Sequence, residues 1–306
     1  MEIDKLLINP STPLQKVEDE ITASHKIHLY IKRLDLTHPQ ISGNKWYKLK
    51  YNLINARKNN YNTLLTFGGA YSNHIYATAA AGKIFNFNTI GIIRGEKHSP
   101  LNPTLTSASK NGMTLHYIDR NSYRTKTNVE VIKSLYNKFG NFYLIPEGGS
   151  NKLAVKGCSE IINELDIPFN YICTACGTGG TLAGIISGLN DSQKALGFAV
   201  LKGAEFLFEN VKDLLYDGNN SNNWDINLDY HFGGYAKIKK DLILFINDFE
   251  KKHNIPIEPI YSGKMLFGLY DLIKKDYFPE DSVIIVLHNG GLQGLEGMRN
   301  KIDLLD

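Results

Sequence analysis

Pairs of glycine stand close behind three apolar, strand-like runs of this chain, at Gly68-Gly69, Gly179-Gly180 and Gly290-Gly291. Glycine lets the backbone approach a bound group closely, because it has no side chain. In open α/β sheets, ligands bind outside the carboxyl ends of the strands. The three junctions therefore predict a ligand-binding site at the carboxyl ends of the strands.

Short strand-like runs alternate with longer helical ones along most of the chain. Apolar runs without polar alternation, as at residues 282–287, are typical of the interior of a parallel sheet. The predicted strands are residues 63–67, 89–93, 114–119, 142–145, 170–175, 197–202 and 282–287, and the predicted helices are 74–84, 128–139, 181–189, 241–253 and 264–274. This order predicts an α/β fold in two halves, with helices on the faces of open, twisted sheets. Residues 217–223 lack apolar side chains and are predicted to form a loop.

The composition excludes several classes of protein. The 306 residues carry 34 Lys and Arg against 31 Asp and Glu, which is too balanced for a protein built mainly to bind nucleic acid. The longest strongly apolar stretch, 283–287, is far too short to cross a membrane, and the N-terminus lacks the pattern of a signal peptide. Three cysteines do not make a disulfide framework. We therefore expect a cytoplasmic protein with no membrane or nucleic-acid partner.

The best candidate for a phosphate site is the segment Gly177, Thr178, Gly179, Gly180 and Thr181, between a predicted strand and a predicted helix. The free N–H groups and the dipole at the start of a helix suit a phosphate. A tight turn without a ligand is the alternative. Leu182 occupies the third glycine position of a dinucleotide-binding fingerprint, and no Walker lysine follows, so the loop matches neither motif.

Two further segments carry polar groups at predicted helix starts. Ser72 is a good N-cap, and the amides that follow it would favour a substrate carboxylate, although Ser72 and Asn73 could also simply cap the helix. Lys45 begins a helix, where the dipole disfavours a cation and lowers the pKa of the amine. Lys45 is therefore a candidate nucleophile, with an ordinary surface lysine as the alternative.

Six stretches, in this order, resemble one family of enzymes. They are IKRLDLTHPQISGNKWYKL (31–49), GGAYSNHIYATAAA (68–81), IPEGGSN (145–151), GTGGTLAG (177–184), PIYSGKMLFGLY (259–270) and HNGGLQG (288–294). They resemble the pyridoxal 5'-phosphate enzymes of the 1-aminocyclopropane-1-carboxylate deaminase and D-cysteine desulfhydrase family. The resemblance spans nearly the whole chain. It implies the tryptophan synthase β-like fold, PLP fold type II.

The resemblance also implies roles for single residues. Lys45 resembles the lysine that forms the imine with pyridoxal phosphate, and the loop 177–181 resembles the cradle of its phosphate. Asn73 resembles the residue that binds the ring oxygen of the cofactor. Ser72, Asn73 and His74 correspond to the substrate-binding loop, in which Ser72 is also a candidate for moving a proton. Tyr261 resembles the catalytic tyrosine beside the cofactor ring.

Two positions depart from the family pattern. Ser262 stands where the deaminase has a glutamate that pairs with the pyridine nitrogen, and Asn289 stands where the family usually has threonine. Either residue could face the pyridine nitrogen, so both are predicted to bind the cofactor. Without a carboxylate the ring withdraws electrons less strongly, which favours the desulfhydrase branch.

The predicted function is therefore that of a lyase converting a small amino acid such as D-cysteine to a 2-oxo acid and ammonia, with release of sulfide. The alternatives are 1-aminocyclopropane-1-carboxylate deamination, a non-catalytic protein that binds pyridoxal phosphate or an amino acid, and a nucleotide-binding α/β protein. By resemblance we expect a homodimer, whose subunit has a large cofactor-binding domain, residues 1–47 and 153–306, and a smaller inserted α/β domain, residues 48–152.

No metal site is expected. Cys173 and Cys176 have the C-x-x-C spacing, but on a strand they would point to opposite faces. Such a pair is poorly placed to hold a metal ion or to form a disulfide.

Overall fold

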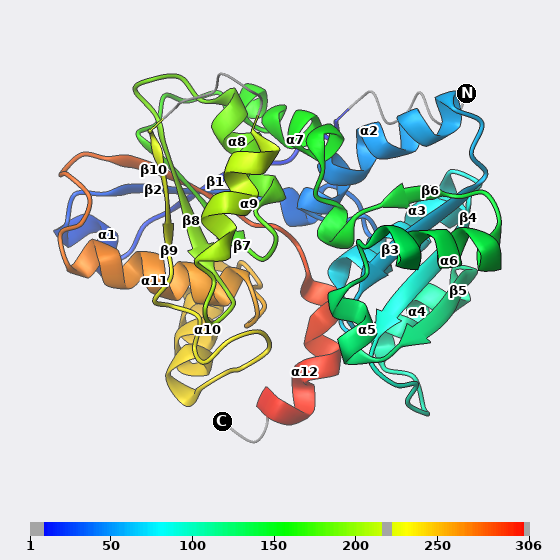
Figure 1. Ribbon diagram of the computed structural model, residues 1–306. Helices are drawn as coiled ribbons and strands as arrows, with labels where there is room; N and C mark the ends of the chain where they lie inside the picture. The colour runs from blue at the N-terminus through cyan, green and yellow to red at the C-terminus, as the bar shows by residue number, and fades with distance from the viewer. Residues whose placement is uncertain (1–8, 216–221, 303–306) are drawn as a thin grey trace.

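The computed structural model describes residues 9–215 and 222–302, and its strands form two sheets. The larger sheet has six strands in the order β1-β2-β10-β7-β8-β9, and the smaller has four in the order β5-β4-β3-β6. Neighbouring strands are parallel throughout, except for β1 and β2, which pair antiparallel. In Figure 1 the two sheets stand on opposite sides of the view, with α12 between their lower parts. The predicted α/β fold with two sheets is confirmed.

The elements have the following bounds. The strands are β1 Leu14–Val17, β2 His28–Lys32, β3 Thr63–Gly68, β4 Asn88–Arg94, β5 Met113–Ile118, β6 Tyr143–Ile145, β7 Tyr171–Cys176, β8 Lys194–Ala199, β9 Trp224–Asn227 and β10 Val283–Leu287. The α-helices are α1 Glu20–Ser24, α2 Asn44–Lys58, α3 Asn73–Ile84, α4 Pro103–Lys110, α5 Arg120–Arg124, α6 Val129–Phe139, α7 Lys152–Ser159, α8 Gly180–Gly188, α9 Phe206–Leu214, α10 Lys240–His253, α11 Ser262–Lys274 and α12 Leu295–Ile302.

The predicted interior strands and the helices between them are present, with ends that shift by one or two residues in most cases. The largest shift is in β8, which starts at Lys194 rather than at residue 197, because its first residues pair with β7. The predictions omitted β2, an interior strand of the larger sheet, and the outer strands β1 and β9, which have four residues each and carry polar side chains. Most of the predicted loop 217–223 lies outside the described residues.

The strand β7 separates two parts of the core. Cys173 packs with apolar side chains of α10 and α11, whereas Cys176 packs with those of α2, α7 and α8. The two sulfur atoms therefore face opposite sides of the sheet, and all three cysteines are buried and free. Within the described ranges, no cluster of three His, Cys, Asp or Glu side chains could hold a metal ion. Across the same ranges, no helix has both the length and the apolar character needed to span a membrane.

The two predicted domain boundaries both fall within helices. The first, after residue 47, lies inside α2, and the second, after residue 152, lies at the first residue of α7. The four strands of the smaller sheet all lie between these positions. The smaller inserted domain, residues 48–152, therefore remains a prediction.

Candidate active site

The glycine-rich junctions after β3, β7 and β10 border one cavity of about 450 Å³. Nearly all the predicted site residues line it: Lys45, Ser72, Asn73, His74, Gly177, Thr178, Gly179, Gly180, Thr181, Tyr261 and Asn289. Ser262 is the exception, since it is not among the lining residues. Polar residues that the sequence analysis did not single out also line the cavity: Asn44, Lys48, Arg94, Lys126, Glu147, Asn210 and Tyr235.

Lys45 is the second residue of α2 and points into this cavity. Its Nζ donates to Asn44 Oδ1 over 2.7 Å, and Asn44 Nδ2 in turn donates to Thr181 Oγ1 over 2.8 Å. Burial, together with the positive charge of Lys48, lowers the pKa of Lys45 to about 7. A large share of the amine is therefore unprotonated at neutral pH, as a nucleophile requires.

Lys48 lies one helical turn after Lys45 and is almost fully buried. Its Nζ donates to Ser150 Oγ over 2.9 Å, and Ser150 Oγ lies 2.6 Å from Thr178 Oγ1. No described carboxylate lies within ion-pairing distance of Lys48, and burial lowers the pKa of its amine to about 8. The lysine therefore presents a cation beside the glycine loop. In the sequence, its i+3 spacing from Lys45 was the feature that placed the two lysines on the same side of the helix.

The segment between β7 and α8 forms a cradle in which side chains would not fit. Gly179 has a φ of +79°, and a Cβ on Gly177 would lie 3.3 Å from the Tyr261 ring. A Cβ on Gly180 would lie 2.5 Å from Ser150 Oγ. The free N–H groups at the start of α8 are thus left accessible next to two hydroxyls and the Lys48 cation, an arrangement that suits a phosphate.

We expect Lys48→Met to lower the affinity for a phosphate-bearing cofactor by about 10- to 100-fold, because a charge-assisted hydrogen bond is lost. Equilibrium dialysis of pyridoxal phosphate against the variant measures this change. Lys50→Met is the control: Lys50 lies on the same helix but pairs with Glu160, outside the cavity. Equal losses of affinity in the two variants would contradict the assignment of Lys48 to the phosphate.

The loop after β3 forms another part of the cavity wall. Ser72 caps α3, since its Oγ accepts from Ile75 N over 3.3 Å, as predicted. Asn73 Oδ1 accepts from Gln293 Nε2 over 2.8 Å, which leaves the amide hydrogens of Asn73 available to a ligand. Gln293 had no sequence signal, because the bond joins two residues that are 220 positions apart.

His74 has a different environment from the one predicted. Its Nε2 lies 2.8 Å from Thr66 Oγ1, and the Thr66 hydroxyl donates to the Ile145 carbonyl oxygen. Thr66 Oγ1 therefore accepts a hydrogen bond from the Nε2–H group, and Nδ1 is a buried acceptor with no partner among the described residues. Burial lowers the pKa of His74 well below its usual value. A neutral acceptor does not favour the predicted contact with a substrate carboxylate.

Tyr261 stands at the start of α11, and its ring lies edge-to-face with Tyr235 at 6.1 Å. Burial and the nearby Tyr235 raise the pKa of Tyr261 well above its usual value, so the phenol keeps its proton at neutral pH. Tyr235 comes from the segment between β9 and α10, for which the sequence analysis predicted no element. The pair can therefore donate protons but does not supply a phenolate.

The two candidates for the pyridine nitrogen lie in different environments. Asn289 lines the cavity, and its Nδ2 donates to Thr174 Oγ1 over 2.8 Å, while its Oδ1 is buried without a partner among the described residues. Ser262 is fully buried, and its backbone N–H donates to Glu258. Asn289 is therefore the better placed of the two.

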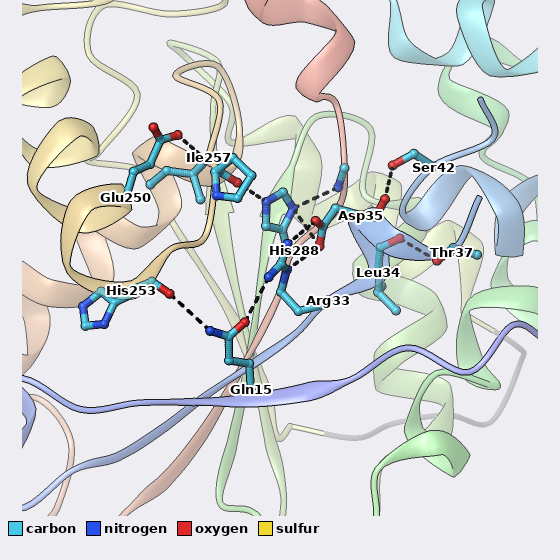
Figure 2. A network of polar contacts seen from close by, with 12 residues as sticks. Gln15, Arg33, Leu34, Asp35, Thr37, Ser42, Glu250, His253, Ile257 and His288 are labelled. Atoms are coloured by element: carbon cyan, nitrogen blue, oxygen red, sulfur yellow. Dashed lines mark hydrogen bonds and ion pairs between the residues drawn. The ribbon is translucent and has the colours of Figure 1, made fainter. Parts of the chain in front are cut away.

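A buried polar network holds the loops of Lys45 and Asn289 together, as Figure 2 shows. Arg33 donates twice to Asp35, whose Oδ1 lies 3.8 Å from His288 Nδ1. His288 Nδ1 accepts from Gly290 N, so its proton sits on Nε2 and is donated to the Pro256 carbonyl. Ser42 Oγ donates to the Asp35 carbonyl oxygen over 3.0 Å. The segments before Lys45 and around Asn289 are thus fixed by the same side chains.

Comparison with known proteins identifies the family. Residues 6–290 match the family described as "Pyridoxal-phosphate dependent enzyme". A protein of Pyrococcus furiosus, provisionally named a 1-aminocyclopropane-1-carboxylate deaminase, is 33% identical over 97% of this chain and 94% of its own length. The mitochondrial bifunctional D-cysteine desulfhydrase/1-aminocyclopropane-1-carboxylate deaminase of Arabidopsis thaliana is 34% identical over 87% of this chain and 73% of its own length.

A solved structure described as an ACC deaminase homologue superposes with a TM-score of 0.84 at 28% identity, covering 100% of this chain and 99% of that one. The resemblance predicted from six short stretches is therefore confirmed along the chain. The sequence match and the fold agree, and the chain belongs to the family of pyridoxal-phosphate-dependent enzymes.

Proposed function

We propose that this enzyme is a lyase that converts D-cysteine and water to pyruvate, hydrogen sulfide and ammonia. The observation that carries the proposal is Lys45, an amine with a pKa of about 7 that lines the same cavity as the glycine-rich loop 177–181 and the start of α3 at Ser72. The names of the relatives, which include both D-cysteine desulfhydrase and 1-aminocyclopropane-1-carboxylate deaminase, support this reaction class.

The residues present fit pyridoxal phosphate. The loop 177–181 and Lys48 would hold the phosphate, Lys45 would attach the cofactor covalently, and the Asn73 amide would bind its ring oxygen. Asn289 carries a buried oxygen without a partner on the same cavity, as expected where a ligand completes the hydrogen bonding. When bound, the cofactor supplies an electron sink that stabilises negative charge at the α-carbon of an amino acid.

The protein's own groups would orient the substrate and move its protons. The start of α3, with the Ser72 hydroxyl, would bind the α-carboxylate through N–H and O–H donors. The neutral Nζ of Lys45 would accept the α-proton, because its lowered pKa makes it a base at neutral pH. Tyr261 holds its proton in the same cavity and would deliver it to the departing sulfur.

The charges around the cavity favour elimination of sulfide over opening of a cyclopropane ring. Asn289 would offer the pyridine nitrogen an uncharged amide oxygen, which stabilises a protonated ring nitrogen less than a carboxylate would. Glu147 is the one carboxylate among the described lining residues, and it already pairs with Lys126. Glu258 accepts from three backbone N–H groups at the start of α11 and is not among the lining residues. The weaker electron sink suits the easier reaction.

The absorbance spectrum of the cofactor-loaded enzyme, recorded before and after adding D-cysteine, tests this function. We expect the visible band to change and pyruvate and sulfide to accumulate in equal amounts. Turnover of 1-aminocyclopropane-1-carboxylate but not of D-cysteine would instead establish the deaminase alternative. A cofactor band that no amino acid alters would establish a binding protein without catalysis.

The lowered pKa of Lys45 gives a second test, in the protein freed of cofactor. The rate at which pyridoxal phosphate attaches should rise with pH and reach half its maximum near pH 7, because only the neutral amine reacts. Stopped-flow absorbance gives these attachment rates, and a midpoint near pH 10.5 would contradict the assignment.

The lowered pKa of Lys45 also affects the folding stability. The unfolded chain holds this proton up to about the ordinary pKa of 10.5, so the folding stability should rise as the pH increases from 7 to 10.5.

The assembly and location of the enzyme are also proposals. We propose a homodimer in the cytoplasm, whose smaller domain, residues 48–152, is inserted into the cofactor-binding domain. Analytical ultracentrifugation of the purified enzyme measures whether it is a homodimer.

A further inference from the structure

A charged cluster lies on the part of the cavity wall that the smaller sheet provides. Arg94 ends β4, Lys126 follows α5, and Glu147 follows β6, and all three line the cavity. They gather around the buried ring of Tyr123: the guanidinium carbon of Arg94 lies 5.9 Å from the ring centroid, and Lys126 Nζ lies 4.7 Å from it. The reaction proposed above uses none of them.

The positive charge of this cluster is not balanced. One carboxylate oxygen of Glu147 accepts from the Tyr123 hydroxyl over 2.8 Å, and the other lies 3.1 Å from Lys126 Nζ. Glu147 and Lys126 thus neutralise each other. Arg94 is exposed where it lines the cavity and forms no hydrogen bond or ion pair with any described residue, so its guanidinium donors are free to bind a ligand.

Arg94 stands next to the loop that is proposed to hold the substrate. A Cβ on Gly69, at the start of residues 68–74, would lie 3.9 Å from Arg94 Nη2. The guanidinium and the capping residue Ser72 therefore line the same side of the cavity, within reach of one small molecule. D-cysteine has a single carboxylate and a thiol, and leaves this guanidinium without an anionic partner.

We propose that Arg94 forms a subsite for a second negative charge, and that the enzyme accepts small amino acids whose β-carbon carries an anionic group. This inference rests on the proposed function, because it requires an amino-acid substrate held at the start of α3. An arginine suits the purpose, since its planar donors can bind two oxygens of a carboxylate, sulfonate or phosphate at once.

Aspartate and asparagine provide the test, because they have the same shape and differ in the charge on the group attached to the β-carbon. The change in the cofactor absorbance on titration gives a dissociation constant for each D-amino acid, with the L-forms measured in parallel. We expect the holoenzyme to bind D-aspartate about 10- to 100-fold more tightly than D-asparagine, the gain from one charge-assisted contact. Arg94→Gln should remove this difference and leave the affinity for D-asparagine unchanged.

Lys97→Gln is the matched control. Lys97 is exposed, lies three residues after Arg94 and does not line the cavity, so its loss should preserve the preference for aspartate. If Arg94→Gln weakens the binding of D-aspartate and D-asparagine equally, the proposal is overturned and Arg94 is assigned to the α-carboxylate. Equal affinities in the unmodified enzyme would also overturn it. If D-cysteine still reacts in that case, the proposed function stands without this subsite; if no amino acid changes the spectrum, both proposals fail.

Discussion

Replacing Lys45 with alanine is expected to lower the turnover of D-cysteine by at least about a thousandfold, because the reaction loses both its attachment point and its base. The reason lies in the position of one amine. Lys45 Nζ is held by Asn44 on the cavity wall, and Asn44 is held by Thr181 of the phosphate cradle. Among the described residues, Lys48 and Lys126 are the only other lysines that line this cavity.

Two further variants separate the amine from its charge and from the helix. Lys45→Arg keeps the positive charge but cannot form the imine, so it should be as inactive as the alanine variant. Lys58→Ala changes an exposed lysine at the other end of α2 and should leave turnover unchanged. Borohydride reduction followed by peptide mass spectrometry should find the cofactor on the peptide that contains Lys45. Cofactor found on another lysine, or turnover that survives Lys45→Ala, would contradict the mechanism.

Replacing Gly43 with alanine is expected to destabilise the fold and to prevent cofactor binding. Gly43 precedes α2 with φ +69° and ψ −147°, and a Cβ there would overlap the backbone carbonyl of Asn289. The clash involves two backbone segments that the Asp35 and His288 network already fixes, so neither can move away freely. Lys45 and Asn289 would both be displaced.

Gly140 offers a control that isolates this clash. It has almost the same backbone conformation, φ +73° and ψ −149°, but a Cβ there would meet nothing within 4 Å. Gly140→Ala should cost about 1–3 kcal/mol from backbone strain alone. Gly43→Ala should cost at least about 2 kcal/mol more, as overpacking adds to the same strain. Urea denaturation of both variants measures the difference, and equal costs would show that the approach to Asn289 is unimportant.

The sequence was sufficient for the features that depend on short stretches of chain. The interior strands are buried on both faces, so their apolar runs identify them without reference to the rest of the molecule. The glycines of residues 177–180 and the cap at Ser72 depend on the local backbone, and both lie where they were predicted. The strands β1, β2 and β9 were missed, because short strands with polar residues carry little of this pattern: β1 and β9 have four residues each, and β2 begins with His28 and ends with Lys32.

Several features of the site depended on the tertiary structure. Whether Ser262 or Asn289 faces the cavity depends on how α11 and the segment after β10 pack, and the sequence left both open. His74 keeps Nδ1 as its free nitrogen because its Nε2 hydrogen-bonds to Thr66 on β3.

The sequence by itself determined the α/β fold class and the six motifs that identified the family. The tertiary structure alone decided which polar groups meet in the cavity. It placed Lys48 beside the glycine-rich loop 177–181 and left Arg94 without an anionic partner among the described residues. The physical reason is that a pattern in the sequence reports local backbone preference and burial, whereas the charge and hydrogen bonding of a side chain depend on neighbours that are distant in the sequence.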